Sequence, residues 1–432
     1  MDRLDLRLLQ EILMYLDLTS LRNAALSCRT LFHALKGAEV LITSKAFLRQ
    51  IDYDLLPEAI LVHMSKSFPL EDSVRNEVVK KLKHRECAPV KWNLSDALPL
   101  AQFHEKLSVL AKQAACEAFE KQPRLQREST QITYEELRRF ERAFYRFELF
   151  CNLHSYSGQD DDFFSSFSKW ENEQLACVHE HLTRVISRPY NYLVDHDITW
   201  GDLEVGYIRC DDGYGTLESE YILSRGIEKI YILQQASGYT EWHTLLSRGE
   251  DRNDEPSQLH HFLRDKLVWW ASPDMLGDAL SETSSEAEEK DISDNTPFYE
   301  DPDPGPALIW EWMYRDRYHD TFLAFIGKVR HREWAFPFWG HSRLQVAGLL
   351  GDPDIPGPRS SIDQEMAQYS NPDRLKLLEE TQRERSEIDG YGWYDRGDLS
   401  QVKRLKVGED PPRNEELPQN IYYRGPRTSS RR

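Results

Sequence analysis

The sequence predicts a mainly α-helical protein, in which an N-terminal three-helix unit precedes a large irregular helical domain that carries a disordered acidic insertion. Near the N-terminus, apolar residues recur at intervals of three and four, the spacing that places side chains on one stripe of a helix. Thr133 and Glu136 have the spacing of a capping box, which marks a helix start. A second apolar stripe follows at Leu137, Phe140, Phe144, Phe147 and Cys151.

The N-terminal stretch, residues 4–42, has the most specific pattern in the chain. Its first helix carries an apolar stripe, formed by Leu9, Ile12, Leu13 and Leu16. Asp17 is a candidate N-cap for the next helix, because its carboxylate can accept bonds from free N–H groups. That helix would bury Leu21, Ala25 and Cys28, and residues 31–35 form a third. Helices this short enclose only a small core, so their apolar face must be covered by the rest of the chain or by another protein.

Apolar periodicity and turn residues predict the remaining helices and the domain boundaries. Helices are expected at residues 46–67, 74–84, 99–121, from 133, at 163–188 and 259–270, and from Asn371 onwards. The expected divisions are an N-terminal unit at 1–44, a helical domain in two parts at 45–280 and 307–388, the acidic insertion at 281–306 and a flexible tail at 389–432. The insertion is assigned as mobile, because nine carboxylates and one lysine leave it too polar to offset its ordering entropy.

Two aromatic segments and one histidine pair admit more than one interpretation. The stripe of residues 137–151 is expected to be core, with a ligand groove as the alternative. The aromatic rings of residues 307–350 are expected to close a core against earlier helices or, alternatively, to line a pocket for a substrate degron. The rings considered are Trp310, Trp312, Trp334, Phe336, Phe338 and Trp339. His179 and His181 stand two apart and so point to different sides of a helix. We therefore expect them near the surface, without a shared metal ion.

Net charge, apolar runs and cysteine spacing limit the partners and the cellular location that the sequence allows. The formal net charge of −19 argues against binding to nucleic acid or to anionic lipid. The sequence shows neither a membrane-spanning apolar run nor a signal peptide, which predicts a cytoplasmic or nuclear location. Its six cysteines are widely spaced and form no C-x-x-C pair, so they are interpreted as buried structural residues. No metal or other cofactor is predicted.

Two segments match only part of a catalytic motif, and no enzymatic activity is predicted. His104-Glu105 is followed by Ser108 where a zinc protease motif needs its second histidine. Residues 340–344 read GHSRL, with Leu344 where a nucleophile elbow needs its second glycine.

The N-terminal stretch resembles an F-box. The Leu-rich opening of that family is matched by Leu4, Leu6, Leu8, Leu9, Ile12 and Leu13. Its Tyr-Leu-Asp turn is matched by Tyr15, Leu16 and Asp17. Its later positions are matched by Ser20, Leu21, Ala25, Leu26, Cys28 and Arg29. The chain departs from the family at Asp5, where a proline is usual. Residues 130–350 also loosely resemble a group of fungal proteins, some with an F-box-like start, through the segments FERAFYRFELFCNL, WENEQLAC and DPDPGPALIW.

The F-box resemblance implies a substrate receptor for an SCF-type ubiquitin ligase. Its N-terminal helices would bind the Skp-type adaptor, cullin would be joined indirectly, and the remaining domain would hold an unknown protein substrate. The candidate adaptor-binding residues are Leu4, Leu9, Ile12, Leu13, Leu16 and Leu21, some of which must instead pack the unit itself. The alternative is a non-catalytic interaction or structural protein whose degenerate F-box no longer binds the adaptor, with Asp5 as the mark of that loss.

Overall fold

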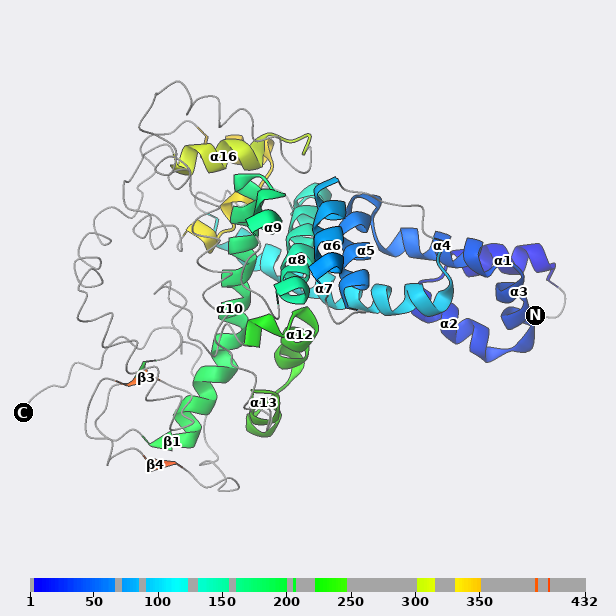
Figure 1. Cartoon of the computed structure of the whole chain (residues 1–432), viewed down its shortest axis with the longest axis horizontal. Helices are drawn as coiled ribbons and strands as arrows, with labels where there is room; N and C mark the ends of the chain where they lie inside the picture. The colour runs from blue at the N-terminus through cyan, green and yellow to red at the C-terminus, as the bar shows by residue number, and fades with distance from the viewer. Residues whose placement is uncertain are drawn as a thin grey trace, which may run out of the picture.

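The computed structural model of the chain is mainly α-helical, which confirms the predicted fold class (Figure 1). It describes residues 4–66, 72–84, 91–122, 131–154, 161–199, 205–206, 222–246, 301–314, 331–350, 393–394 and 403–404. The predicted helices at 259–270 and from Asn371, residues 281–300 of the acidic stretch and most of the predicted tail lie outside these ranges.

The chain begins with four short helices that lie at one end of the molecule (Figure 1). They are α1 (Leu6–Met14), α2 (Leu18–Ser27), α3 (Arg29–Gly37) and α4 (Glu39–Gln50). The predicted N-cap is confirmed, because the Asp17 carboxylate accepts a hydrogen bond of 2.7 Å from the Ser20 N–H. The helix predicted over residues 46–67 is instead divided, because α4 ends at Gln50 before an extended residue, Ile51.

The next elements connect this end to the body of the protein. They are a 3₁₀ turn η1 (Tyr53–Leu55), α5 (Leu56–Ser65), α6 (Asp72–His84) and the long α7 (Leu94–Glu120). The prediction that α7 starts at Pro99 was wrong, since Pro99 lies inside the helix. The helix starts earlier because the Asn93 side chain accepts a bond of 2.9 Å from the Asp96 N–H and so caps it.

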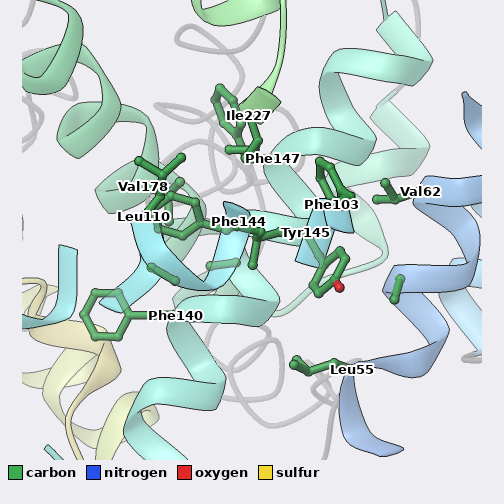
Figure 2. Packing of buried hydrophobic residues seen from close by; sticks show 14 of the residues in the cluster. Leu55, Val62, Phe103, Leu110, Phe140, Phe144, Tyr145, Phe147, Val178 and Ile227 are labelled. Carbon is green, nitrogen blue, oxygen red and sulfur yellow. The ribbon is translucent and has the colours of Figure 1, made fainter. Parts of the chain in front are cut away.

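Helix α8 (Tyr134–His154) lies at the centre of the body, packed against α5, α7 and α10. Its predicted capping box is confirmed: the Glu136 carboxylate accepts from the Thr133 N–H at 2.9 Å and the Thr133 hydroxyl accepts from the Glu136 N–H at 3.2 Å. Phe140, Phe144 and Phe147 are buried, as Figure 2 shows, and so is Cys151. The aromatic stripe is therefore core, with Leu137 half-buried at its start.

Six charged residues of α8 are buried as well, and ion pairs or hydrogen bonds join several of them to neighbouring segments. Arg146 forms ion pairs with Glu58 of α5 at 3.3 Å and with Glu171 at 2.7 Å. Glu148 accepts a hydrogen bond of 2.7 Å from the Ile227 N–H and pairs with Lys66 at 3.2 Å. Because a buried charge without a partner costs several kcal/mol, about 3–5 when one member of a pair is removed, these contacts constrain the packing around α8.

Helices α9 (Asp161–Ser165) and α10 (Lys169–Asp197) pack along α8 and carry a second capping box. The Glu171 carboxylate accepts from the Ser168 N–H at 2.9 Å, and the Ser168 hydroxyl accepts from the Glu171 N–H at 3.4 Å. His179 and His181 of α10 are both buried. The expectation that they lie at the surface was wrong, because α10 is covered on several sides and burial follows tertiary packing more than local polarity.

Helices α12 (Ile227–Gln235) and α13 (Tyr239–Leu246) follow on the same body. Gly226 precedes α12 with φ of 82°, a left-handed conformation that favours glycine. A Cβ at this position would lie 2.6 Å from the Glu148 carboxylate, so the close approach also requires glycine. Short antiparallel strands complete the described elements: β1 (Ile198–Thr199) pairs with β4 (Lys403–Arg404), and β2 (Val205–Gly206) with β3 (Trp393–Tyr394).

The aromatic-rich segment closes the core at the end of the body opposite α1 (Figure 1). It comprises α16 (Gly305–Tyr314), the 3₁₀ turn η2 (Phe336–Phe338) and α18 (His341–Val346). Trp310, Trp334, Phe336, Phe338 and Trp339 are buried, while Trp312 is half-buried. Phe338 stacks on Phe140 of α8 with ring centroids 3.9 Å apart. The predicted core role of these rings is confirmed.

Ion pairs hold this segment to the start of α8. Arg139 donates to Asp301 through two nitrogens, at 2.5 and 2.9 Å, and also pairs with Asp303 at 3.4 Å. Burial alone would lower the pKa of Arg139, but the bonds to Asp301 raise it above its ordinary value. Residues 301–306, assigned above to a mobile insertion, are thus packed on the helical body at their acidic positions, because the buried guanidinium needs these carboxylates.

We predict that Arg139→Ala lowers the free energy of unfolding by roughly 3–5 kcal/mol, because Asp301 and Asp303 lose the cation that compensates their charges. Arg22→Ala, at an exposed arginine of α2, is the matched control and should change stability by less than about 0.5 kcal/mol. Denaturant unfolding followed by circular dichroism measures both. Equal stability of the two variants would contradict the role given to Arg139.

Candidate functional site: the apolar surface of the N-terminal helices

Large apolar side chains are exposed mainly at the N-terminal end of the described chain. Of 17 such residues, 11 fall within the first 53 positions. They are Leu4, Leu6, Leu8, Ile12, Tyr15, Leu26, Phe32, Val40, Leu41, Leu48 and Tyr53. Single exposed apolar residues are ordinary on a protein surface, but a concentration of them on neighbouring helices is typical of an interaction site.

Helix α1 carries two apolar stripes, one buried and one exposed. Leu9 and Leu13 face the interior and are 2% and 0% exposed. Leu8, Ile12 and the C-cap residue Tyr15, at steps of four and three residues, lie together on another side of the helix, and the exposed Leu4 precedes its N-cap. Leu8 and Ile12 are each 49% exposed, and Tyr15 is 74% exposed. We call these four residues the α1 stripe.

The structure divides the candidate adaptor-binding residues into two sets. Leu9, Leu13 and Leu21 are buried, and Leu16 is half-buried, so these side chains pack the N-terminal unit itself. Leu4 and Ile12 are exposed and belong to the α1 stripe. Leu8 and Tyr15 are exposed on the same side but are not among the candidate contacts predicted from the sequence. Their spacing from Ile12, four and three residues, was a signal that could have identified them.

Specific contacts hold the unit in a form that leaves the α1 stripe uncovered. The Gln10 side-chain amide donates to the Ala34 carbonyl at 3.1 Å, which joins α1 to α3. The Leu18 N–H donates to the Gln50 amide oxygen at 2.9 Å, which joins α2 to α4. Helices α2 and α4 pack against α7, whereas the aromatic segment lies at the far end of the body (Figure 1). The unit is thus attached to the body through faces other than the α1 stripe.

Asp5, which stands where the F-box motifs that this stretch resembles usually have a proline, occupies the N-cap position of α1. Its φ of −63° and ψ of 144° are backbone angles that a proline also adopts. The Asp5 side chain makes no capping hydrogen bond and is exposed. The backbone geometry that proline would impose is therefore present without it, and what differs is an added negative charge.

The N-terminal unit, taken as helices α1 to α4 in residues 4–51, is basic although the whole chain is acidic. Residues 4–51 contain six lysines and arginines and four carboxylates, a net charge of +2, against −19 for the whole chain. The basic residues are Arg7, Arg22, Arg29, Lys36, Lys45 and Arg49. The exposed apolar residues are thus accompanied by positive charge, which favours a partner surface of negative potential.

A small cavity in the body is the other candidate site, and it is too small for a substrate. Its volume is about 10 Å³, which suits a single water molecule, and its lining includes Cys177 and His181 of α10. Burial lowers the pKa of His181 to about 3, so this imidazole is neutral at physiological pH. Burial also raises the pKa of the Cys177 thiol well above its ordinary value, which disfavours a nucleophilic thiolate.

The incomplete catalytic motifs have structural roles in the fold. His104 Nδ1 lies 2.9 Å from the Tyr145 hydroxyl, and the Ser108 hydroxyl donates to Glu141 at 2.7 Å. At the GHSRL segment, the Gly340 N–H donates to Glu136 at 3.1 Å and the His341 N–H to Asp303 at 2.8 Å. The last two bonds dock the start of α18 on α8 and on Asp303, which precedes α16. None of them presents a nucleophile and a base to an open cleft in the described ranges.

The described residues contain neither a candidate metal site nor a candidate membrane-spanning helix. No group of three or more His, Cys, Asp or Glu side chains in these ranges is placed to hold a metal ion. Among the same residues, no helix combines the length and the apolar character needed to cross a bilayer. Comparison with known proteins adds no assignment: no family model matches the chain, and no curated protein or solved structure is significantly similar to it.

We predict that the two stripes of α1 respond differently to truncation. Leu13→Ala should lower the free energy of unfolding by roughly 2–5 kcal/mol, because it leaves a cavity in the unit. Ile12→Ala, one residue away but exposed, should change it by less than about 0.5 kcal/mol. Urea titration of the full chain distinguishes them. Comparable losses for both variants would show that Ile12 is covered in solution.

Proposed function

We propose that this chain is an F-box-type substrate receptor: its N-terminal helices bind the Skp-type adaptor of an SCF ubiquitin ligase, and the larger helical body holds a protein target. Cullin is joined only through the adaptor. The chain makes and breaks no bond itself; it raises the local concentration of its target near a ubiquitin-charged enzyme. Such a receptor works in the cytoplasm or the nucleus.

The observation that carries this proposal is the α1 stripe. Most of the residues that resemble the opening helix of an F-box form a helix here. That helix exposes Leu8 and Ile12, and the residues that flank it expose Leu4 and Tyr15. A helix offered in this way suits an apolar groove on a partner, where anchors at helical spacing are read together. Tyrosine is also among the residue types most often found at interface hot spots.

The size of the apolar contribution is consistent with a specific protein complex. Complete burial of a leucine or isoleucine side chain contributes about 1.5–3 kcal/mol, and a half-exposed side chain contributes roughly half of that on binding. The three aliphatic members of the α1 stripe therefore supply a few kcal/mol, before the aromatic ring of Tyr15 is added. Association costs about 4–15 kcal/mol, which is more than these side chains supply, so neighbouring contacts are needed for tight binding.

The alternative function is a non-catalytic interaction or structural protein whose F-box-like start no longer binds the adaptor. One observation favours it: the exposed carboxylate of Asp5 adds a charge at the entry to α1, at the edge of the α1 stripe. Under this alternative, the adaptor does not bind the chain at all. The two functions are thus distinguished by one binding measurement.

We predict that the full chain binds purified Skp-type adaptor and that Ile12→Arg weakens this binding by about a hundredfold or more, since the new charge is buried at the contact without a partner. Ile232→Arg is the matched control: Ile232 is 42% exposed on α12, close to the 49% of Ile12, but lies in the body. Isothermal titration calorimetry measures the affinities.

The control variant should bind as wild type does. If wild-type chain does not bind the adaptor, the alternative function stands. If Ile12→Arg binds as tightly as Ile232→Arg, the adaptor contacts a surface other than the α1 stripe.

A further inference from the structure

Helix α4 exposes a second apolar face, which the F-box resemblance does not assign. It buries Ile42, Thr43, Ala46 and Phe47 on one side. On the opposite side Val40, Leu41 and Leu48 are 43%, 52% and 49% exposed. The burial pattern follows the helical period, so this exposed half of α4 is a continuous surface. We call its residues Val40, Leu41, Lys45, Leu48 and Arg49 the α4 face.

The α4 face is joined to the α1 stripe through one contact. The Arg49 guanidinium carbon lies 4.7 Å from the centroid of the Tyr15 ring, within the range of a cation–π interaction. Arg49 Nη1 also donates to the Met14 carbonyl at 3.4 Å, at the end of α1. A row of side chains on α4 is formed at four-residue intervals by Leu41, Lys45 and Arg49. Because Arg49 contacts Tyr15, this row lies next to the α1 stripe.

Charge identifies the kind of surface that would cover this face. Lys45 and Arg49 are both exposed, and no carboxylate lies among the five residues of the α4 face. The unit that carries the face is net positive, whereas residues 52–432 carry a net charge of −21. Apolar side chains beside two cations fit a partner surface that combines apolar contacts with carboxylates at its rim.

We propose that the adaptor contact extends from the α1 stripe across Tyr15 and Arg49 onto the α4 face, where an acidic apolar surface of the same partner covers Leu41 and Leu48 and pairs with Lys45 and Arg49. This inference rests on the proposed function, and it adds a second helix to the interface. Tyr15 lies at the junction, held by Arg49, and anchors both halves of the contact. The extension supplies the neighbouring contacts that the α1 stripe alone lacks.

The test compares full-length variants in binding to purified Skp-type adaptor at low and at physiological salt. Leu41→Ser with Leu48→Ser removes apolar contacts and should weaken binding by about tenfold at either salt concentration. Lys45→Glu with Arg49→Glu reverses two charges and should weaken binding by at least about tenfold at low salt. It should also flatten the salt dependence that wild-type chain shows, a readout that a loss of folding would not give.

The matched control is Leu245→Ser with Leu308→Ser, at two exposed leucines of the body, which should bind as wild type does. If both α4 double variants bind like wild type while Ile12→Arg does not, the extension to α4 is wrong and the proposed function stands. If wild-type chain itself fails to bind, the proposed function is wrong and the inference fails with it. Self-association of the chain that the α4 variants abolish would instead assign the face to a second copy.

Discussion

The charged side chains that α8 buries are the constraint on which the rest of the structure depends. A helix covered on all sides by other elements cannot leave its arginines and glutamates in water, so each must find a partner inside. Arg139 is met by Asp301 and Asp303, Arg146 by Glu58 and Glu171, and Glu136 by Arg343. Segments more than 150 residues apart in sequence, such as Arg139 and Asp301, are thereby held at one helix.

The same constraint explains why the two ends of the molecule differ. At the end with the aromatic segment, stacked and buried rings and ion pairs close the surface, as the contact of Phe140 with Phe338 illustrates. At the other end, four short helices enclose a core of their own with Leu9, Leu13 and Leu21, and have more apolar side chains than that core can hold. The surplus lies on α1 and α4, exposed. The body thus covers most of its large apolar side chains, whereas the N-terminal unit leaves many of its own exposed.

Local patterns were sufficient to predict the helical class, the Asp17 cap, the Thr133–Glu136 capping box and the core role of Phe140, Phe144 and Phe147, because each depends on residues within one or two turns. They failed where distant segments decide the outcome. His181 looks like a surface residue by its polar neighbours but is buried under other helices. Likewise, the periodicity of α1 identified its apolar residues but could not predict whether Leu13 or Ile12 faces the interior. That depends on where α3 and α4 pack.

We propose that the N-terminal unit, and not the body, binds the adaptor. Hydrogen–deuterium exchange of the full chain, with and without purified Skp-type adaptor, tests this most directly because it reports on every helix at once. Amides of α1 and α4 should become slower to exchange when the adaptor is added, while those of α8 and α10 stay unchanged. Unchanged exchange in α1 and α4, or protection confined to the body, would contradict the claim.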